Sequence, residues 1–336
     1  MIATSPAFCD EIRIASYHTG LSRDGPGLLL RDIHRGEDAQ IAASIDVIRA
    51  ADADILVLQD FDYDGRGLAL TAFADALEQA GAPYPHLFAL RPNSGRMTEF
   101  DLNGNGRSGD AQDAEGYGRF NGQSGMAILS RLPIGEDVRD FSRLLWSEMP
   151  EPQVIRLFSP EITEILPLFS VAAWQVPIIL PNGSDLQLLA THATAPVFDG
   201  PEDRNGHRNA DVLRFWQAYL SGWHPPNMRA LTSPQFALIG TLNVDPDQGE
   251  GHRDVLRDLL AHPAIQDPIP RSASGIIQTA DWPEPEPGNL RVDYILPAAD
   301  LPVMDHGLIW GEENEDLANA VALASDHRLV WVDIAF

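Results

Sequence analysis

Short apolar runs, each bounded by turn residues, alternate with amphipathic helical patterns along the chain, and this alternation limits the possible folds more than any other feature. Apolar runs of roughly four to eight residues are typical of buried strands. Between them hydrophobic residues recur at helical spacing, as at Ile41, Ile45 and Ile48. No segment rich in Gly, Ser or Pro divides the chain, so we expect one α/β domain over residues 1–336. The predicted strands are 13–17, 55–59, 126–129, 174–180, 186–192, 236–239, 292–296 and 329–334.

Three polar insertions interrupt this pattern, at residues 91–125, 136–152 and 278–289. The last of them carries three prolines among acidic residues. Insertions of such length in a compact domain are usually functional or mobile. We therefore expect these insertions to be functional or mobile loops.

The charge of the chain restricts its partners. It has 49 acidic and 23 basic residues, a formal net charge of −26 at neutral pH. A surface with that average charge repels nucleic acid and anionic membranes, so strong general binding to DNA is not expected. Divalent cations, or an acidic surface that favours solubility in salt, agree better with the composition.

Neither a disulfide framework nor a membrane anchor is expected. Cys9 is the only cysteine, which excludes an intramolecular disulfide and a cysteine-rich zinc site. The most apolar stretch, 166–180, is short and is broken by Pro167 and Pro177. Residues 1–14 lack a basic cap followed by a long apolar segment. These features predict a cytoplasmic protein without a membrane span.

Polar side chains stand at the ends of the predicted strands. Residues at strand ends or in the loops that follow can converge on one rim of a sheet. The side chains in question are carboxylates, carboxamides and imidazoles, which hold hard cations and transfer protons. They belong to Gln59 and Asp60, His192, Asn243, Asp293, and Asp326 with His327.

Through these residues the chain resembles the endonuclease/exonuclease/phosphatase superfamily over nearly its whole length. The resemblance implies a four-layer α/β sandwich of two packed mixed, mostly antiparallel sheets flanked by helices. It also implies a hydrolase of phosphoester bonds. Each motif is short, but their order and spacing agree with the family. The motifs are Arg13-Ile-Ala-Ser-Tyr-His-Thr19, Leu58-Gln59-Asp60, Gly125-Met-Ala-Ile-Leu-Ser-Arg131, Ala190-Thr-His192, Gly240-Thr-Leu-Asn243, Arg291-Val-Asp293 and Ser325-Asp326-His327.

The resemblance implies a divalent cation, Mg²⁺ or Mn²⁺, as cofactor. Asp60 stands where the family usually has a metal-binding Glu, and it is one methylene shorter. Asp326 resembles a second carboxylate on the metal side. Carboxylates in these places can hold the ion beside a phosphate oxygen.

Four further side chains take catalytic roles by resemblance. His327 would bond the phosphate or transfer a proton, and Asp293 would orient its ring, because a carboxylate fixes an imidazole's tautomer. His192 is a candidate acid at the leaving group. Asn243 would donate its amide to the phosphate or to the attacking water.

Two positions depart from the family pattern. His18 stands where the family has Asn, and Thr241 replaces the Asp of the Gly-Asp-x-Asn motif, which aligns or deprotonates the attacking water. Thr cannot act as a charged base at neutral pH. An imidazole is a poorer ligand for Mg²⁺ than an amide oxygen, although His18 can bind a transition metal.

Two functions remain open. The first is a metal-dependent phosphodiesterase, nuclease or phosphatase that acts by in-line attack of water. For it, the acidic composition makes a small or lipid-like phosphoester at least as plausible a substrate as nucleic acid. The second is a catalytically impaired or inactive family member that binds a phosphate ligand or a protein.

The first insertion contains a candidate loop for structural Ca²⁺. Oxygen side chains alternate there before Gly106, as at the start of an EF-hand loop. Gln112 stands where the closing Glu is usual, and an ordinary Asx-rich turn is the alternative. The candidate ligands are Asp101, Asn103, Asn105, Asp110 and Asp113.

The remaining histidines have no mutual metal-ligand spacing, so we expect individual roles for residues such as His207 and His252. Arg204, His207 and Arg208 lie at the start of a predicted helix. They would meet a substrate phosphate or simply form a solvated helix start.

Overall fold

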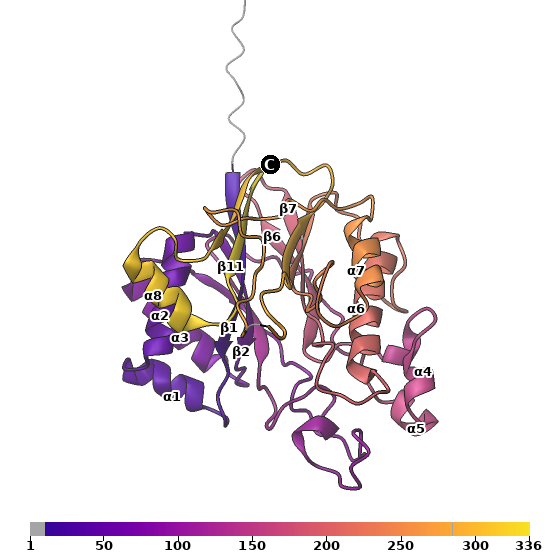
Figure 1. The fold of residues 1–336 in the computed structure, drawn as a ribbon. Helices are drawn as coiled ribbons and strands as arrows, with labels where there is room; N and C mark the ends of the chain where they lie inside the picture. The colour runs from indigo at the N-terminus through magenta and orange to yellow at the C-terminus, as the bar shows by residue number, and fades with distance from the viewer. Residues whose placement is uncertain (1–10, 284) are drawn as a thin grey trace, which may run out of the picture.

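The computed structural model describes residues 11–283 and 285–336, which form two facing β-sheets with helices on their outer sides (Figure 1). The order of layers is helix, sheet, sheet, helix. The predicted four-layer α/β sandwich is therefore confirmed. Cys9 and the rest of residues 1–10 lie outside the described residues, and so does the prediction that depends on them.

The first sheet has the order β10-β11-β1-β2-β4-β3. The first and last strands of the chain are neighbours in it and run antiparallel. Only β1 and β2 are parallel, so these two end at the same edge of the sheet. The strands are β1 (Glu11–Leu21), β2 (Ile55–Phe61), β3 (His86–Phe88), β4 (Gly125–Ser130), β10 (Val303–Ile309) and β11 (Leu329–Ala335).

The second sheet has the order β5-β6-β7-β8-β9. It again contains one parallel pair, β7 with β8, while its other neighbours are antiparallel. Both sheets thus agree with the mixed, mostly antiparallel arrangement that was predicted. The strands are β5 (Arg139–Asp140), β6 (Ala172–Ile179), β7 (Asp185–His192), β8 (Phe236–Thr241) and β9 (Asp293–Pro297).

Helices cover the outer face of each sheet, because a parallel strand pair needs a crossover connection. The first sheet is covered by α1 (Leu28–Arg35), α2 (Ala39–Ala51), α3 (Leu68–Gln79) and α8 (Glu315–Ala324), on the left in Figure 1. The second is covered by α6 (Arg204–Leu220) and α7 (Arg253–Leu260), with the short α4 (Val154–Leu157) and α5 (Pro160–Thr163) nearby. Two 3-10 turns lie in loops, η1 (Ala111–Asp113) and η2 (Trp146–Glu148).

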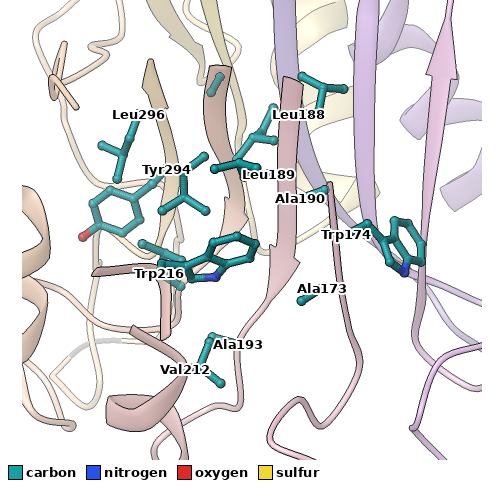
Figure 2. Close-up of a cluster of buried hydrophobic side chains, with 14 of the residues drawn as sticks. Ala173, Trp174, Leu188, Leu189, Ala190, Ala193, Val212, Trp216, Tyr294 and Leu296 are labelled. Atoms are coloured by element: carbon teal, nitrogen blue, oxygen red, sulfur yellow. The ribbon is translucent and has the colours of Figure 1, made fainter. Parts of the chain in front are cut away.

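Alternation of side chains along the strands builds separate cores. Ile14 and Val57 face the second sheet, whereas Tyr17 and Leu58 pack under the helices of the first. Figure 2 shows the second sheet, with Trp174 on the side of the first sheet, where its ring meets Phe88, and Trp216 on the opposite side. The same alternation directs His18, two positions from Ser16 and four from Ile14, into the space between the sheets.

All eight predicted strands are present, with ends shifted by a few residues. The strands β3, β5 and β10 were not predicted. Segment 136–152, one of the predicted polar insertions, contains β5 and η2 and buries Phe141 and Trp146 completely. Among the described residues, no helix is long and apolar enough to cross a lipid bilayer.

Candidate active site

Three histidines that are remote in sequence meet between the two sheets. The ring of His18, on β1, stacks on His327 at a centroid distance of 4.0 Å. It also meets the ring of His192, at the end of β7, edge to face at 5.2 Å. The first sheet therefore supplies His18 and His327, and the second supplies His192, so the site exists only where the sheets face each other.

His327 is held by a buried carboxylate. Its Nδ1 lies 2.8 Å from Oδ2 of Asp293, at the start of β9. The hydroxyl groups of Thr241 and Thr279 donate to the same carboxylate, at 2.6 and 2.8 Å. Burial opposes ionisation of Asp293, but the neighbouring His327 charge and these hydrogen bonds bring its pKa below the ordinary value. Asp293 is therefore a fixed anion that sets the orientation of the His327 ring.

The insertion 278–289 forms one wall of this arrangement. Thr279 accepts hydrogen bonds from the backbone amides of Val292 and Asp293, both at 2.9 Å, while it donates to the Asp293 carboxylate. Trp282 places its ring edge-on against His327 at 5.2 Å. Neither residue was predicted for the site. The length of the insertion was the only feature of the sequence that pointed to it.

His18 and His192 are electrically neutral at physiological pH. Burial lowers the pKa of both rings to about 3, and the neighbouring imidazoles act in the same direction. Nδ1 of each ring is buried and has no hydrogen-bond partner among the described residues. A buried polar atom without a partner is costly. These two nitrogens are thus available to a metal ion, a phosphate or a water molecule.

Two carboxylates stand beside the histidines. Asp60 follows Gln59 at an irregularity in the pairing of β2 and has a left-handed backbone, with φ of 53°. Asp60 and Asp326 line a cavity of about 360 Å³ together with His18 and His327. Neither carboxylate makes a hydrogen bond or ion pair with the described part of the chain. Both are therefore free to accept a ligand from solution.

The donor set of this cavity fits one hydrated divalent cation. Within the described residues, Asp60, Asp326 and His18 do not have ligand atoms that all lie within 4.8 Å of one another, so no compact three-ligand cage is present. Mg²⁺ needs no such cage, because it usually keeps several waters and uses one or two carboxylates plus a substrate phosphate. The unpartnered Nδ1 of His18 adds a softer donor, which suits Mn²⁺ or a later transition metal.

A second cavity, of about 570 Å³, has His192 and Asn243 on its wall. Asn243 has a left-handed backbone, with φ of 61°, and donates one amide hydrogen to the carbonyl of Ala193 at 2.8 Å. Most of the remaining wall is apolar, with the side chains of Trp146, Phe158, Leu166, Val171, Val197 and Phe198. His18 lines the first cavity and His192 the second, so the contact between their rings brings one residue of each wall together.

Hydrogen bonds within the candidate calcium loop account for its shape. Asp101 accepts from the amides of Asn105 and Gly106, at 3.1 and 2.7 Å. The side-chain amide of Asn105 donates to Asp110 at 2.7 Å, as Asn103 does at longer range. The buried Asp113 accepts from backbone amides and closes the turn at η1. Calcium binding there stays a prediction.

The structure brings two of the remaining histidines together, although their spacing in the sequence does not indicate it. His207 and His252 lie together, and with Asp203 they form the one group of three possible metal ligands within the described residues. Only part of this group could be predicted from the sequence. Asp203 and His207 stand one helical turn apart, but the arrival of His252 depends on how α7 packs against α6.

Comparison with known proteins identifies the family and supports the fold. A model of the Endonuclease/Exonuclease/phosphatase family matches residues 33–327. An endonuclease/exonuclease/phosphatase from Beutenbergia cavernae has a similar structure, with a TM-score of 0.59 and 18% identity, covering 97% of this chain and 72% of that one. A comparison with curated protein sequences gives no match.

Two further solved structures are similar. Sphingomyelinase C from Streptomyces griseocarneus has a TM-score of 0.52 and 17% identity, covering 96% of this chain and 99% of its own. A 3'-5' exonuclease from Neisseria meningitidis has a TM-score of 0.52 and 15% identity, covering 97% of this chain and all of its own. At such identities the likeness concerns the fold.

Proposed function

The chain belongs to the endonuclease/exonuclease/phosphatase family, and on that premise we propose that it hydrolyses phosphoester bonds by in-line attack of water, with the help of a divalent cation. One observation carries the proposal. The Asp293–His327 pair stands at one cavity with Asp60 and Asp326, whose carboxylates have no partner in the described part of the chain. Carboxylates for a cation and a fixed imidazole for proton transfer are what this reaction requires.

Asp60 and Asp326 would hold the cation, with His18 as an additional donor. Mg²⁺ or Mn²⁺ agrees best with two carboxylates. A bound divalent ion supplies a Lewis acid beside a phosphate oxygen and lowers the pKa of a coordinated water. The shorter reach of Asp60 is offset by its place on a backbone irregularity at the end of β2, which directs its side chain into the cavity.

The histidines would bind the phosphate and move the proton. Because Nδ1 of His327 bonds to Asp293, the opposite nitrogen is left for the phosphate or the water. His192 would protonate the leaving oxygen. Its ring is neutral in the free protein, but a bound phosphate raises the pKa of a neighbouring imidazole by its negative charge. Asn243 has a second amide hydrogen that remains free to bond a phosphate oxygen.

The cavity beside His192 favours a small or lipid-like substrate with an apolar leaving group. Its wall is mainly apolar, and Phe198, which lines it, is 84% exposed. Its two arginines are already engaged: Arg204 donates to the carbonyl of Leu102, and Arg208 to those of Pro167 and Leu168. A polyanion such as DNA finds few free cations there, and the net charge of −26 repels it.

A metal-dependence assay of the full chain tests this proposal. The protein is stripped with EDTA, and hydrolysis of bis(p-nitrophenyl) phosphate, p-nitrophenyl phosphate and a choline phospholipid is measured with and without Mg²⁺ or Mn²⁺. We expect activity only with metal, and His327→Ala should lower kcat by about two to four powers of ten. His34→Ala, exposed on α1, is the matched control. Activity insensitive to both EDTA and His327→Ala would refute the mechanism.

A second candidate function, an impaired member that binds phosphate without turnover, is favoured by one observation. The hydroxyl of Thr241 donates to Asp293, so no carboxylate stands at that position to activate water. Calorimetry with inorganic phosphate and phosphorylated small molecules separates the two candidates. Tight binding without hydrolysis under Mg²⁺, Mn²⁺ and Zn²⁺ supports the binding protein, and metal-dependent turnover lost in His327→Ala excludes it.

Restoring the family residues asks whether the two departures limit catalysis. The double variant with Thr241→Asp and His18→Asn should gain at least about tenfold in metal-dependent activity, about 1.4 kcal/mol of barrier. Thr241→Asp places a second carboxylate against Asp293, which raises the pKa of one of them, so His18→Asn alone is the control. A folded double variant that binds metal without faster hydrolysis would show that another feature limits the rate.

A further inference from the structure

Two helices of the second sheet begin side by side and bring metal-binding side chains together. α6 starts directly after Asp203, α7 starts directly after His252, and the two helices pack against each other (Figure 1). Asp203 and His207 are four positions apart and therefore share one side of the α6 start. One possible ligand atom from each of Asp203, His207 and His252 lies within 4.8 Å of the others.

The Asp203 carboxylate does not cap the start of α6. Asp203 precedes α6 with a left-handed backbone, φ of 53°, and its side chain caps no backbone amide. Its side chain lies instead over Gly206, where an added Cβ would come 2.0 Å from Oδ1. Only a glycine leaves room for the carboxylate in that place. Its contact is with Nε2 of His252, at 2.8 Å.

The two imidazoles are also available. The rings of His207 and His252 lie with centroids 5.0 Å apart and are tilted by 49°. The His207 ring makes no hydrogen bond with the described part of the chain. Arg204, which follows Asp203 in the sequence, donates to the carbonyl of Leu102, and no arginine of the described residues forms an ion pair with Asp203.

We propose that Asp203, His207 and His252 bind one Zn²⁺, with the fourth position open to water or another ligand. Two imidazole nitrogens and one carboxylate oxygen form a donor set that Zn²⁺ binds tetrahedrally, with three protein ligands. Hard cations such as Mg²⁺ and Ca²⁺ prefer sites made of oxygen atoms alone. This site shares no residue with the cavity of Asp60 and Asp326, and it stands independently of the proposed hydrolysis.

Zn²⁺ at this site ties the start of α6 to the connection between β8 and α7. That connection runs from Leu242 to His252 and includes Asn243. Near its end, Gly251 packs so closely on Pro196 and Val244 that an added Cβ would lie 3.0 Å from each. Asn243 lines the apolar cavity, as does Arg204 directly after Asp203. The ion therefore braces one wall of the apolar cavity.

Zinc titration of the full chain tests the site. The protein is stripped of metal and freed of chelator, and the number of Zn²⁺ bound is measured by calorimetry and by elemental analysis after dialysis. We expect His207→Ala and His252→Ala each to lose one equivalent or to bind it at least about tenfold more weakly. His34→Ala and His327→Ala should keep that equivalent, the latter because it alters only the central histidines. Unchanged stoichiometry and Kd in both His207→Ala and His252→Ala would overturn the proposal.

Gly206→Ala provides a variant that does not depend on removing a ligand. Alanine favours a helix over glycine, so the fold is retained, but its Cβ displaces the Asp203 carboxylate. We expect at least about tenfold weaker Zn²⁺ binding, and a Zn²⁺-induced rise in Tm that is present in the natural protein and reduced in the variant. Wild-type Zn²⁺ binding by Gly206→Ala and by Asp203→Asn would remove the carboxylate from the site and overturn it. These readouts do not involve hydrolysis, so either proposal can fail alone.

Discussion

The molecule contains two aspartate–histidine contacts of the same length and of very different character. Asp293 and His327 meet at 2.8 Å, and so do Asp203 and His252. The first pair is buried, with side chains 1% and 7% exposed, and Asp293 also accepts from Thr241 and Thr279. In the second pair the side chains are 45% and 26% exposed.

The two carboxylates differ in how many hydrogen bonds from side chains they already accept. Asp293 uses its oxygens on three side-chain donors, so its effect is to fix one ring, and the free nitrogen of His327 is the group that can act on a substrate. The Asp203 carboxylate has only His252 as a hydrogen-bond partner among the described residues, so its remaining lone pairs suit an ion. A contact distance alone therefore does not identify the role of an aspartate–histidine pair.

The largest expected effect concerns catalysis. Asp293→Asn replaces the anion by an amide that cannot stabilise a protonated His327, so kcat should fall by about two to four powers of ten. KM should change much less, because the proposed substrate contacts lie on other side chains. Steady-state kinetics with the best phosphoester, together with circular dichroism to verify folding, measure this. A kcat within about twofold of the natural value would reduce Asp293 to a purely structural residue.

The two pairs should also differ in how much they contribute to the free energy of unfolding. Asp293→Ala leaves His327 and two hydroxyl groups without their buried partner, and should cost about 3–5 kcal/mol. Asp203→Asn in metal-free protein should cost less than about 1 kcal/mol, because the pair is partly exposed, the side chain caps nothing, and Asn tolerates the left-handed backbone. Urea unfolding of both variants without metal gives the comparison. Equal costs would contradict the distinction drawn between the pairs.

The two threonines around Asp293 should differ in a graded way. Thr279→Val also leaves the amides of Val292 and Asp293 without an acceptor, so it should cost about 2–3 kcal/mol. Thr241→Val removes a single donor and should cost about 1.5 kcal/mol. The exposed Thr71→Val should stay within about 0.5 kcal/mol. A larger loss of unfolding free energy in Thr241→Val than in Thr279→Val would show that Thr241 contributes more than Thr279 to holding Asp293.

The smallest effect is a dependence on pH. The folded pKa of Asp293 lies below its ordinary value, so its ionised form stabilises the fold at pH above about 4, the unfolded value. That contribution is lost as the pH falls through the folded pKa. The difference in unfolding free energy between the natural protein and Asp293→Asn should therefore shrink as pH decreases below about 4. A difference that is constant between neutral and acidic pH would indicate that the charge of Asp293 contributes nothing.

Much of the fold was predictable because each central strand is a local apolar run. The arrangement of those strands in two packed sheets came from the resemblance, and the order of the strands within each sheet was not predicted, since periodicity alone does not say which strands are neighbours. The strands β3, β5 and β10 were missed for a physical reason. They are short or lie at sheet edges, and β10 exposes much of its length, so they lack a continuous apolar signal.

The site was predictable to the extent that its residues stand at strand ends. The contact between Asp293 and His327 was predicted from the sequence. The contacts of Thr279 and Trp282 with these two residues were not, because both lie in a loop, and a loop has no periodic sequence pattern. The low pKa of His18 arises from burial between two sheets, which no local pattern encodes. His207 and His252 meet only through the packing of α6 on α7.

The stacking of His18 on His327 joins the first strand of the chain to the residues just before its last strand. The hydroxyl of Ser325 donates to the carbonyl of His18 across 307 positions of sequence, and β1 pairs directly with β11. Closing so long a loop adds little free energy, about 0.6 kcal/mol for each doubling of length. The long separation instead lowers the folding rate, because contacts between remote segments form slowly. During synthesis β1 and β2 can pair long before β11 emerges from the ribosome, so the contact between His18 and His327 forms only after the segment up to β11 has been made.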